Sequence, residues 1–419
     1  MFKEVSELKD KKILVVGLGK TGVSLAKFLH AAGAAVTVTD HKSKPELSTQ
    51  LEQLGDLPIK LDLGGHSPKT FLAQDLVILS PGVPSALKIF DYARSQGIKI
   101  TGEFEFVTQF IKEPVIALTG TNGKTTTARL IEACLKESGI SCWVGGSLGT
   151  PMTDYLRLGE KAQVVIAEVS SYMLELCETF NPQNVVFMNL AENHLDRYRS
   201  MEDYVNAKRR IFKNTNQATT SILNADDNAV VELARDPAVQ RGRIFYFSRK
   251  PSLEPQIMNI GGAVNIGNEI RVRTGPEIEY YDITQMKMRG RHSIENVMAA
   301  ILASREHGAN HDAIQRVMNR FTGLPHRLEY IRKVGGVQFF NDSKATNVHA
   351  VLRALDSFDE NVKLTQLFES FNTFLTIFSF TNEDSVANDC ILAQFLENYE
   401  DIYLVKCLLS VLFPIIISF

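Results

Sequence analysis

The sequence predicts an α/β protein with more than one parallel, doubly wound sheet. Short apolar runs alternate with helical patterns as far as about Tyr330. Two glycine-rich turns, one near the N-terminus and one near residue 120, each stand between an apolar run and a helical pattern. A length of 419 residues is typical of two or three domains.

The first glycine turn follows Ile13–Val16, a short apolar run that predicts a buried strand. The turn itself is Gly17-Leu-Gly-Lys-Thr-Gly22, and a helical pattern follows it to about Ala32. The next predicted strand, Val36–Asp40, ends in an acid. This is the order of a dinucleotide fingerprint, whose acid lies about 20 residues beyond the glycines. The turn alone leaves NAD binding and other Rossmann-like uses as alternatives.

Three further apolar runs continue the first sheet: 59–63, 76–79 and 98–101. Ser80-Pro-Gly82 follows the second of these runs, at the carboxyl end of a predicted strand. Ligands bind at that end of doubly wound sheets, so Ser80-Pro-Gly82 is a candidate ligand-binding loop. The alternative is that these residues form a simple Pro-Gly turn. We expect the first domain to end near residue 112.

The second glycine turn is the most informative stretch of the chain. It follows the apolar run Pro114–Leu118, precedes a helical pattern from Ala128 to Gly139, and reads Gly120-Thr-Asn-Gly-Lys-Thr-Thr126. A strand, a glycine loop, Lys-Thr and a helix are the layout of a phosphate-binding loop, in which backbone N–H groups and the helix N-terminus face the anion. Leu118 stands where the first glycine of the standard Walker sequence would be, so this is a shorter form. A glycine-rich turn with an exposed lysine is the alternative.

The two turns together narrow the function. A phosphate-binding loop in a domain of its own is unusual for a dehydrogenase. We therefore expect a nucleotide-linked substrate on the first domain and ATP on the second.

Two more predicted strands of the second domain end in polar residues. Val164–Glu168 ends in a carboxylate, which is a natural Mg²⁺ ligand near a phosphate loop; a surface glutamate is the alternative. His194 follows the strand 185–190 and could bind a second metal ion or contact phosphate, although a lone histidine is more often structural. Between Asp236 and Glu279 the pattern becomes short strands and turns, which predicts a hairpin excursion.

Composition adds modest bounds. A hydrophobic fraction of 44% and a charged fraction of 22% are ordinary for a soluble globular protein, and a net charge of −3 gives no indication of nucleic-acid binding. The 5 cysteines form no Cys-x-x-Cys pair, which fits a reducing cytoplasm. The first 12 residues are charged and do not resemble a signal peptide.

A series of motifs in a fixed order now resembles the Mur ligase family, and within it the branch that adds D-glutamate. The motifs that carry the resemblance are the two glycine turns, Ser80-Pro-Gly82, Glu168-Val-Ser-Ser171, His194-Leu-Asp-Arg197, Ala207-Lys208, Asn224-Ala-Asp-Asp227, Phe321-Thr-Gly-Leu-Pro-His-Arg-Leu-Glu329 and Asn341-Asp-Ser-Lys-Ala-Thr-Asn347. They run from about residue 10 to about residue 360.

The resemblance implies three domains and an ATP-driven reaction of peptidoglycan synthesis. Residues 1–112 would be a Rossmann-like domain for the UDP-sugar, 113–330 a central P-loop ATPase-type domain, and 331–419 an incomplete or atypical Rossmann-like domain for the amino acid. The carboxylate of UDP-MurNAc-L-Ala would be phosphorylated by ATP, and the amine of D-glutamate would attack the acyl phosphate. Such a reaction brings anionic groups together, so it needs Mg²⁺ and fixed cations. We further expect a cytoplasmic monomer that binds no nucleic acid and does not insert stably into a membrane.

The resemblance also assigns roles to residues. ATP and its phosphates would be held by Gly120, Thr121, Asn122, Gly123, Lys124, Thr125, Thr126, Asn296, Arg327 and Asp342. The metal ligands would be Thr125, Glu168, His194 and Lys208, the last as a carbamate. Substrates would be held by Lys20, Thr21, Asp40, Ser80, Pro81, Gly82, Ser147, Lys344 and Thr346, and the catalytic set would be Lys124, Glu168, His194, Lys208 and Lys344. Without the family, an exposed helical lysine is the favoured interpretation of Lys208.

The chain departs from the family pattern at four single positions. Ser147, Asn193 and Ser293 stand for the usual Asn, Asp and Asn, and Met173 stands for the usual Gln. Each exchange removes a polar or charged group, which costs about 1–3 kcal/mol where a buried partner stays unsatisfied.

The largest departure begins after about Val362. From Lys363 to Phe419 there is no glycine, and the Asp-x-Gly-Lys and Ser-Pro-Ala type motifs of the family do not occur. The apolar stretch Cys407–Phe419 is short for a membrane span and contains Pro414. A frameshifted or replaced segment would have this composition; an unusual but ordered small domain is the alternative.

Three functions therefore remain open. An active D-glutamate-adding ligase is the first, and a catalytically defective Mur-ligase-like protein that binds nucleotides is the second. A ligase of the folylpolyglutamate synthetase type shares the phosphate loop, but the Gly17–Gly22 turn and Ser80-Pro-Gly82 argue against it.

Overall fold

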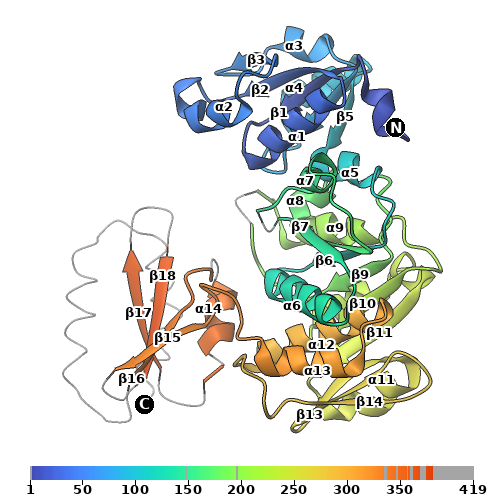
Figure 1. The fold of residues 1–419 in the computed structure, drawn as a ribbon, viewed down its shortest axis with the longest axis vertical. Helices are drawn as coiled ribbons and strands as arrows, with labels where there is room; N and C mark the ends of the chain where they lie inside the picture. The colour runs from blue at the N-terminus through green and yellow to red at the C-terminus, as the bar shows by residue number, and fades with distance from the viewer. Residues whose placement is uncertain are drawn as a thin grey trace. The chain divides into compact units, whose positions relative to one another are not determined.

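The structure is a computed structural model that describes residues 2–380 apart from 148, 195–196, 335–336, 346–347, 356, 359–361 and 369–373. The chain forms two compact units, Met1–Phe321 and Thr322–Phe419 (Figure 1). The predicted α/β class is confirmed: parallel sheets flanked by helices make up the first unit. The division into three domains at residues 112 and 330 stays a prediction.

The N-terminal sheet of the first unit has the strand order β3-β2-β1-β4-β5. Its strands are β1 (Lys12–Val16), β2 (Ala35–Asp40), β3 (Lys60–Leu63), β4 (Leu76–Leu79) and β5 (Lys99–Gly102), all parallel to their neighbours. Its helices are α1 (Lys20–Ala31), α2 (Ser48–Leu54), α3 (Pro68–Leu72) and α4 (Lys88–Ser95). The order reverses between β1 and β4, which places the Gly17–Gly22 turn and Ser80 side by side at the switch point.

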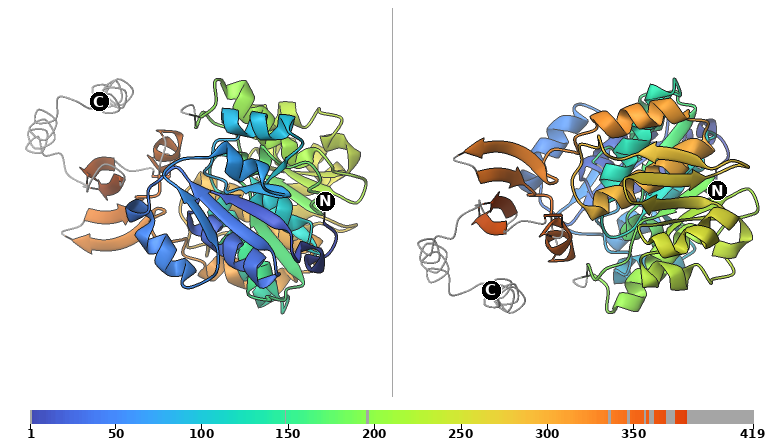
Figure 2. Two further views of the ribbon diagram at one scale, coloured as in Figure 1. Left: turned by 90° about the horizontal axis from the view of Figure 1, so that it is seen from above. Right: turned by 90° about the horizontal axis from the view of Figure 1, so that it is seen from below.

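Strand β1 shows why the sheet is covered on both faces. Ile13 and Val15 belong to one buried cluster, whereas Leu14 and Val16 belong to another. Successive side chains of a strand point to opposite faces, so a continuous apolar run requires a core on each side. Figure 2 shows helices on both sides of the strands.

The larger sheet has the order β14-β13-β12-β11-β10-β9-β6-β8-β7. Its strands are β6 (Val115–Thr119), β7 (Cys142–Gly146), β8 (Val164–Glu168), β9 (Asn184–Phe187), β10 (Thr220–Asn224), β11 (Arg243–Ser248), β12 (Gly262–Ile266), β13 (Glu269–Arg273) and β14 (Glu279–Asp282). Strands β6 to β12 are parallel, and β12, β13 and β14 pair antiparallel. The predicted hairpin is therefore confirmed for β12 and β13, whereas Glu254–Ile260 in the same range is a helix that the sequence did not indicate.

Helices cover this sheet and join it to the first one. They are α5 (Glu103–Thr108), α6 (Lys124–Glu137), α7 (Thr153–Arg157), α8 (Ser171–Leu174), α9 (Met201–Arg209), α10 (Asn228–Leu233), α11 (Glu254–Ile260), α12 (Arg291–Glu306) and α13 (His311–Arg320). Both α12 and α13 pack against α6 (Figure 1). The helix that follows the phosphate loop is thus held from outside by the C-terminal helices of the unit.

Helix α5 fixes the N-terminal sheet to the larger one through two buried carboxylates. Glu103 Oε1 accepts hydrogen bonds from Thr153 N at 2.9 Å and Thr153 Oγ1 at 2.5 Å. Glu105 accepts bonds from the backbone and hydroxyl of Thr179 and from Phe180 N. These contacts hold the two sheets of the first unit together.

The second unit contains a four-stranded sheet of order β15-β16-β18-β17 and one helix within its described residues. Its elements are β15 (Glu329–Val334), β16 (Val337–Asn341), α14 (Val348–Leu355), β17 (Val362–Phe368) and β18 (Phe374–Phe380). All the strand pairs described there are antiparallel, so this part is atypical for a Rossmann-like domain, as the sequence predicts. The apolar stretch 407–419 lies outside the described residues.

In the part of the chain that the structure describes, no helix has both the length and the apolar character that crossing a membrane requires.

Candidate active site

The loop between β6 and α6 has the geometry of a phosphate-binding loop. Gly120 and Gly123 have φ values of 139° and 85°, which favour glycine. A Cβ on Gly120 would lie 2.9 Å from Met188 Cβ, and one on Gly123 would lie 2.5 Å from Asn296 Oδ1. Both glycines are therefore required by conformation and by close packing, whereas a loose surface turn would need neither.

Asn189 holds this loop in shape, although the sequence motifs do not include it. Its Oδ1 accepts hydrogen bonds from Thr121 N at 3.2 Å and Asn122 N at 2.8 Å, and its Nδ2 donates to Asn122 O at 3.1 Å. The only signal in the sequence is its position just past the strand β9. A side-chain amide can satisfy both backbone donors and an acceptor, which explains why it serves here.

Two lysines meet at one carbonyl of the loop. Lys124 Nζ donates to Gly120 O and to Thr121 O, each at 2.9 Å. Lys208 Nζ, from α9, donates to the same Gly120 O at 2.9 Å and to Thr119 Oγ1 at 3.3 Å. The interpretation of Lys208 as an exposed helical lysine is wrong, because only 2% of the residue is accessible.

The environment of Lys208 favours the neutral amine. Burial holds the pKa of Lys208 well below its ordinary value, and the charge of Lys124 lowers it further, against a smaller opposing effect of Glu168. A neutral amine is nucleophilic, so the lowered pKa favours the form of Lys208 that reaction with carbon dioxide requires.

Glu168 lies at the end of β8 and gathers hydroxyl groups. Its Oε2 accepts from Thr125 Oγ1 at 2.9 Å and its Oε1 accepts from Ser147 Oγ at 2.7 Å. The surface alternative is wrong, since Glu168 is 5% exposed. Carboxylate and hydroxyl oxygens are the donors that Mg²⁺ prefers, so the residues fit that ion.

No cluster of three or more His, Cys, Asp or Glu side chains that could hold a metal occurs among the described residues. Glu168 and Thr125 would supply two oxygen ligands of a metal ion, and water, phosphate oxygens or a carbamate on Lys208 would supply the others.

His194 is held in an unusual conformation by aromatic neighbours. Its φ is 58°, its Nδ1 lies 2.8 Å from Tyr172 Oη, and its ring lies 5.0 Å from that of Tyr172 and 6.1 Å from that of Tyr204. Tyr204 also places its hydroxyl 3.2 Å from Thr121 Oγ1 and its ring 4.9 Å from Lys208 Nζ. Tyr204 thus connects the phosphate loop, the buried lysine and His194, although no sequence motif indicated it.

Asn296 reaches the phosphate loop from α12. Its Oδ1 accepts from Thr127 Oγ1 at 3.3 Å, and the residue is 4% exposed. Thr126 lies in the first turn of α6. The predicted ATP-binding residues of the first unit, from Gly120 to Thr126 with Asn296, therefore lie together.

The predicted UDP end surrounds the Gly17–Gly22 turn. Asp40 Oδ2 accepts from Leu18 N at 2.7 Å, and Ser80 Oγ donates to Gly17 O at 2.8 Å. A Cβ on Gly22 would lie 2.0 Å from Gly17 O. Asp40 and Ser80 thus shape the turn through its backbone. The remaining predicted residues of this end lie in the first turn of α1 and in the loop after β4: Lys20, Thr21, Pro81 and Gly82.

The second unit holds the remaining predicted residues. Asp342 Oδ1 accepts from Leu328 N at 3.1 Å, which brings it next to the segment that contains Arg327, and Lys344 N donates to His326 O at 3.1 Å. Burial raises the pKa of Asp342 to about 6, against the lowering effects of the Leu328 hydrogen bond and the Arg327 charge. Thr346 lies outside the described residues.

The positions that depart from the family pattern find partners of their own. Ser147 donates to Glu168, Asn193 Oδ1 accepts from His194 N at 3.0 Å, and Ser293 Oγ donates to Arg289 O at 2.6 Å. Met173 is buried. None of the three polar replacements therefore leaves its own side chain unsatisfied.

Comparison with known proteins identifies the family. The Mur ligase MurD-like N-terminal domain matches residues 11–102 and the Mur ligase middle domain matches residues 118–304. The UDP-N-acetylmuramoylalanine--D-glutamate ligase of Bdellovibrio bacteriovorus is 82% identical over 364 residues, 87% of this chain and 79% of that protein. The ligase of the same name from Geotalea daltonii is 42% identical over 361 residues, 85% of this chain and 77% of that protein.

Solved structures agree in fold. MurF from Acinetobacter baumannii superposes with a TM-score of 0.52 at 16% identity, covering 86% of this chain and 71% of that one. A pseudomurein peptide ligase type C from Methanothermus fervidus gives 0.50 at 22% identity, covering 84% and 78%. At such identities the likeness concerns the fold alone. The sequence matches, the domain matches and the ordered site residues together show that the chain belongs to the Mur ligase family.

Proposed function

We propose that the chain is an ATP-dependent UDP-N-acetylmuramoyl-L-alanine:D-glutamate ligase of peptidoglycan synthesis. The observation that carries the proposal is the meeting of a phosphate loop, a buried carboxylate and a buried lysine at the carboxyl end of β6, in a chain so similar to ligases of that name. A folylpolyglutamate synthetase-type activity is disfavoured by the match of the N-terminal sheet to the MurD-like domain.

The reaction has two balanced steps. A carboxylate oxygen of UDP-MurNAc-L-Ala attacks the γ-phosphorus of ATP, the bond from that phosphorus to the bridging oxygen breaks, and ADP leaves. The amine of D-glutamate then attacks the acyl carbon; the C–O bond to phosphate breaks, and the nitrogen loses a proton. The residues bring the reactants together and exclude water from the acyl phosphate.

The phosphate end of the site belongs to the loop before α6. The backbone N–H groups of Gly120–Thr126 and the Lys124 ammonium would bind the ATP phosphates, with Asn296 beside Gly123 and with Arg327 and Asp342 from the second unit. When bound, Mg²⁺ would neutralise phosphate charge and orient the transferred group. Thr125, Glu168, His194 and Lys208 as a carbamate would hold the metal ions.

The carboxylate substrate would enter from the N-terminal sheet. Lys20, Thr21, Asp40 and the Ser80–Gly82 loop would bind its UDP end, and Ser147 would contact it beside Glu168. Lys344 and Thr346 would bring D-glutamate. We also propose that the chain is a cytoplasmic monomer; the free thiols of Cys134, Cys142 and Cys177 agree with a reducing compartment.

The test is product formation. Purified chain with Mg-ATP, UDP-MurNAc-L-Ala and D-glutamate should yield UDP-MurNAc-L-Ala-D-Glu by mass spectrometry, and L-glutamate is the matched control that should give no product. Tight binding of both nucleotides without any product would favour the alternative of a Mur-ligase-like protein that binds but does not ligate.

A further inference from the structure

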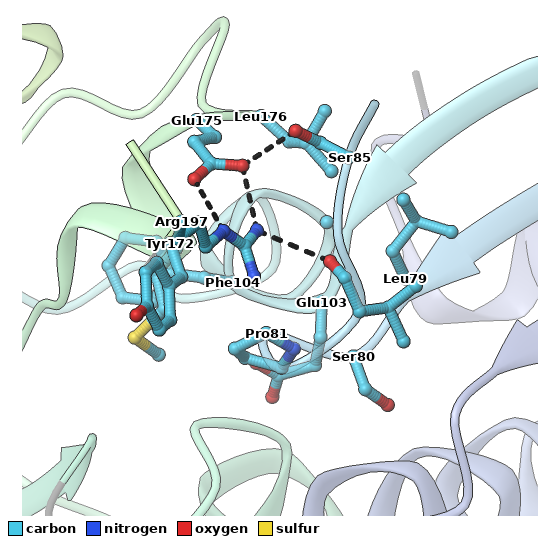
Figure 3. Close-up of a pocket in the computed structure, with 13 residues that line it drawn as sticks. Leu79, Ser80, Pro81, Ser85, Glu103, Phe104, Tyr172, Glu175, Leu176 and Arg197 are labelled. Carbon is cyan, nitrogen blue, oxygen red and sulfur yellow. Dashed lines mark hydrogen bonds and ion pairs between the residues drawn. The ribbon is translucent and has the colours of Figure 1, made fainter. Parts of the chain in front are cut away.

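A small pocket lies where the N-terminal sheet meets the larger sheet (Figure 3). One side is the loop after β4, with Ser80, Pro81 and Ser85, and the other side is formed by Tyr172 and Glu175, around α8, together with Arg197. This pocket therefore lies between the predicted UDP end and the loop that carries His194. None of the predicted roles uses Glu175 or Arg197.

Arg197 makes a two-pronged contact across this pocket. Its Nε and Nη2 donate to Glu175 Oε1 and Oε2 at 3.1 and 2.8 Å, and Nη2 also donates to Val83 O at 3.3 Å (Figure 3). The side chains of Arg197 and Glu175 are 15% and 14% exposed. A planar guanidinium suits this fork geometry, which a lysine cannot reproduce.

Glu175 also binds the N-terminal sheet's loop. Its carboxylate accepts from Ser85 Oγ at 2.6 Å and from Tyr198 Oη at 2.8 Å, in addition to Arg197. Burial alone would raise the pKa of Glu175, but these hydrogen bonds offset it and the net pKa is lowered. The carboxylate thus stays charged and ties the loop after β4 to the segment after β9.

Arg197 is also connected to His194, through the side chain of Tyr172. Its guanidinium lies 4.1 Å from the centre of the Tyr172 ring, and the Tyr172 hydroxyl lies 2.8 Å from His194 Nδ1. The backbone N–H groups of Arg197 and Tyr198 both donate to His194 O at 3.0 Å. A non-glycine residue at a φ of 58° needs such support from its surroundings.

We infer that Arg197 is a positioning residue that sets the Ser80–Gly82 loop in register with His194. The inference rests on the proposed function. In that reaction the carboxylate at one end of a UDP-linked substrate must reach the phosphate loop while its nucleotide end stays on the N-terminal sheet. Arg197 and Glu175 join the two sides over which that substrate would extend.

The test compares Arg197→Met, Arg197→Lys and Glu175→Gln with the unchanged chain. We expect Arg197→Met to weaken UDP-MurNAc-L-Ala binding in calorimetry by about 10- to 100-fold while Mg-ATP affinity changes little. The imidazole signals of His194 in nitrogen-15 NMR should shift, and Arg197→Lys should recover part of the binding. Glu175→Gln should act in the same direction as Arg197→Met, because it replaces one of the two acceptor oxygens of the fork by an NH2 donor and removes the negative charge.

Arg210→Met is the matched control. Arg210 is also a partly buried arginine that holds α8, through Leu174 O, Cys177 O and Glu178, and none of these partners lines the pocket. The Arg210→Met variant should have a lower melting temperature, but the ratio of its affinities for UDP-MurNAc-L-Ala and Mg-ATP should equal that of the unchanged chain. If Arg197→Met fails to fold, UDP-MurNAc-L-Ala binding and the His194 signals of Arg197→Lys and Glu175→Gln decide whether Arg197 has the positioning role.

The outcomes separate the two claims. Equal binding of UDP-MurNAc-L-Ala by the unchanged chain and by the Arg197 variants, with unmoved His194 signals, would overturn the positioning role alone. Absence of any binding by the unchanged chain would overturn the proposed function and the inference with it.

Discussion

Lys208 buries its amine beside a second lysine, Lys124, and both side chains donate to Gly120 O. The pKa of Lys208 is lowered from an ordinary 10.5, mainly by burial. Because the pKa is lower in the folded chain than in the unfolded chain, protonation of this amine favours the unfolded chain. The free energy of unfolding is therefore highest above pH 10.5 and decreases as the pH falls toward the pKa of the folded chain. At neutral pH the lysine therefore destabilises the fold.

We predict that Lys208→Met stabilises the chain at pH 7 and abolishes ligation. The gain should be on the order of 1 kcal/mol, because methionine fills a similar volume without a charge whose burial is unfavourable. Denaturant unfolding in bicarbonate-free buffer would measure it, and exposed Lys161→Met is the control that should change little. A loss of stability on Lys208→Met would show that the hydrogen bonds to Gly120 and Thr119 outweigh the burial of the charge.

Glu103 is a buried carboxylate whose pKa is also changed by burial. Burial raises its pKa above the ordinary 4.5, the Thr153 hydrogen bonds oppose this, and Asp154 adds to it. A raised folded pKa means that the stability it contributes is complete below pH 4.5 and is lost as the pH rises through the folded value. Its Oε2 atom is buried without a hydrogen-bond partner, which agrees with a preference for the protonated form.

We therefore predict that Glu103→Gln gains stability relative to the unchanged chain as the pH rises above about 4.5. Melting temperatures of both proteins across about pH 4 to 8 would measure the difference. A difference that does not depend on pH would mean that the carboxylate keeps an ordinary pKa in the fold.

At the scale of elements, the loop before α6 depends on glycine for two separate reasons. Gly123 has a φ of 85° and leaves room for Asn296, whereas Gly139 after the same helix has a φ of 78° and nothing within 4 Å of the place where a Cβ would lie. Alanine at either site should cost about 1–2 kcal/mol for the left-handed backbone.

We predict that Gly123→Ala weakens Mg-ATP binding, on the order of tenfold or more, whereas Gly139→Ala leaves this affinity unchanged. Titration calorimetry on both variants separates the shared backbone strain from the contact with Asn296. Equal nucleotide affinity of the two variants would argue against the loop as the phosphate site.

The N-terminal sheet makes a second prediction at this scale. Asp40 already accepts bonds from the backbone N–H groups of Leu18 and Lys42, so its carboxylate is engaged in shaping the turn. We expect UDP-MurNAc-L-Ala to raise the melting temperature and NAD(H) to leave it unchanged in thermal-shift assays. The reverse result would revive a dehydrogenase-type use of the turn.

At the scale of the whole molecule, our proposal assigns the two steps of the reaction to different parts of the chain. Nucleotide binding would rely mainly on the first unit, which contains the predicted phosphate loop and the Gly17–Gly22 turn. The amine step would rely on the second unit, in which the family motifs fade after about Val362.

We therefore predict that this chain binds both nucleotides about as well as the Bdellovibrio bacteriovorus relative but forms product more slowly. Poor positioning of the amine affects the coupling step alone, and it can cost about 100-fold in rate. Side-by-side calorimetry and product assays on the two proteins test this. Equal turnover would show that residues 363–419 position the amine as well as the C-terminal motifs of other family members do.

The sequence by itself determined the α/β class, the strands of the N-terminal sheet, the phosphate loop and the family. These features are local: a strand, a turn and a helix N-terminus lie within a few residues, so their hydrogen bonds follow from residue order. The ordered motifs then predicted that Glu168, His194 and Lys208 belong to one site.

Only the tertiary structure decided how those residues are used. Asn189 supports Asn122 from 67 positions away, Lys208 reaches Gly120 across 88 and Arg197 reaches Val83 across 114. Burial and pKa depend on which helices and strands cover a side chain, and no local pattern records that. The contacts of Lys208 therefore form only when α9 packs beside the loop after β6, and the contact of Arg197 with the loop after β4 forms only when the two sheets pack together.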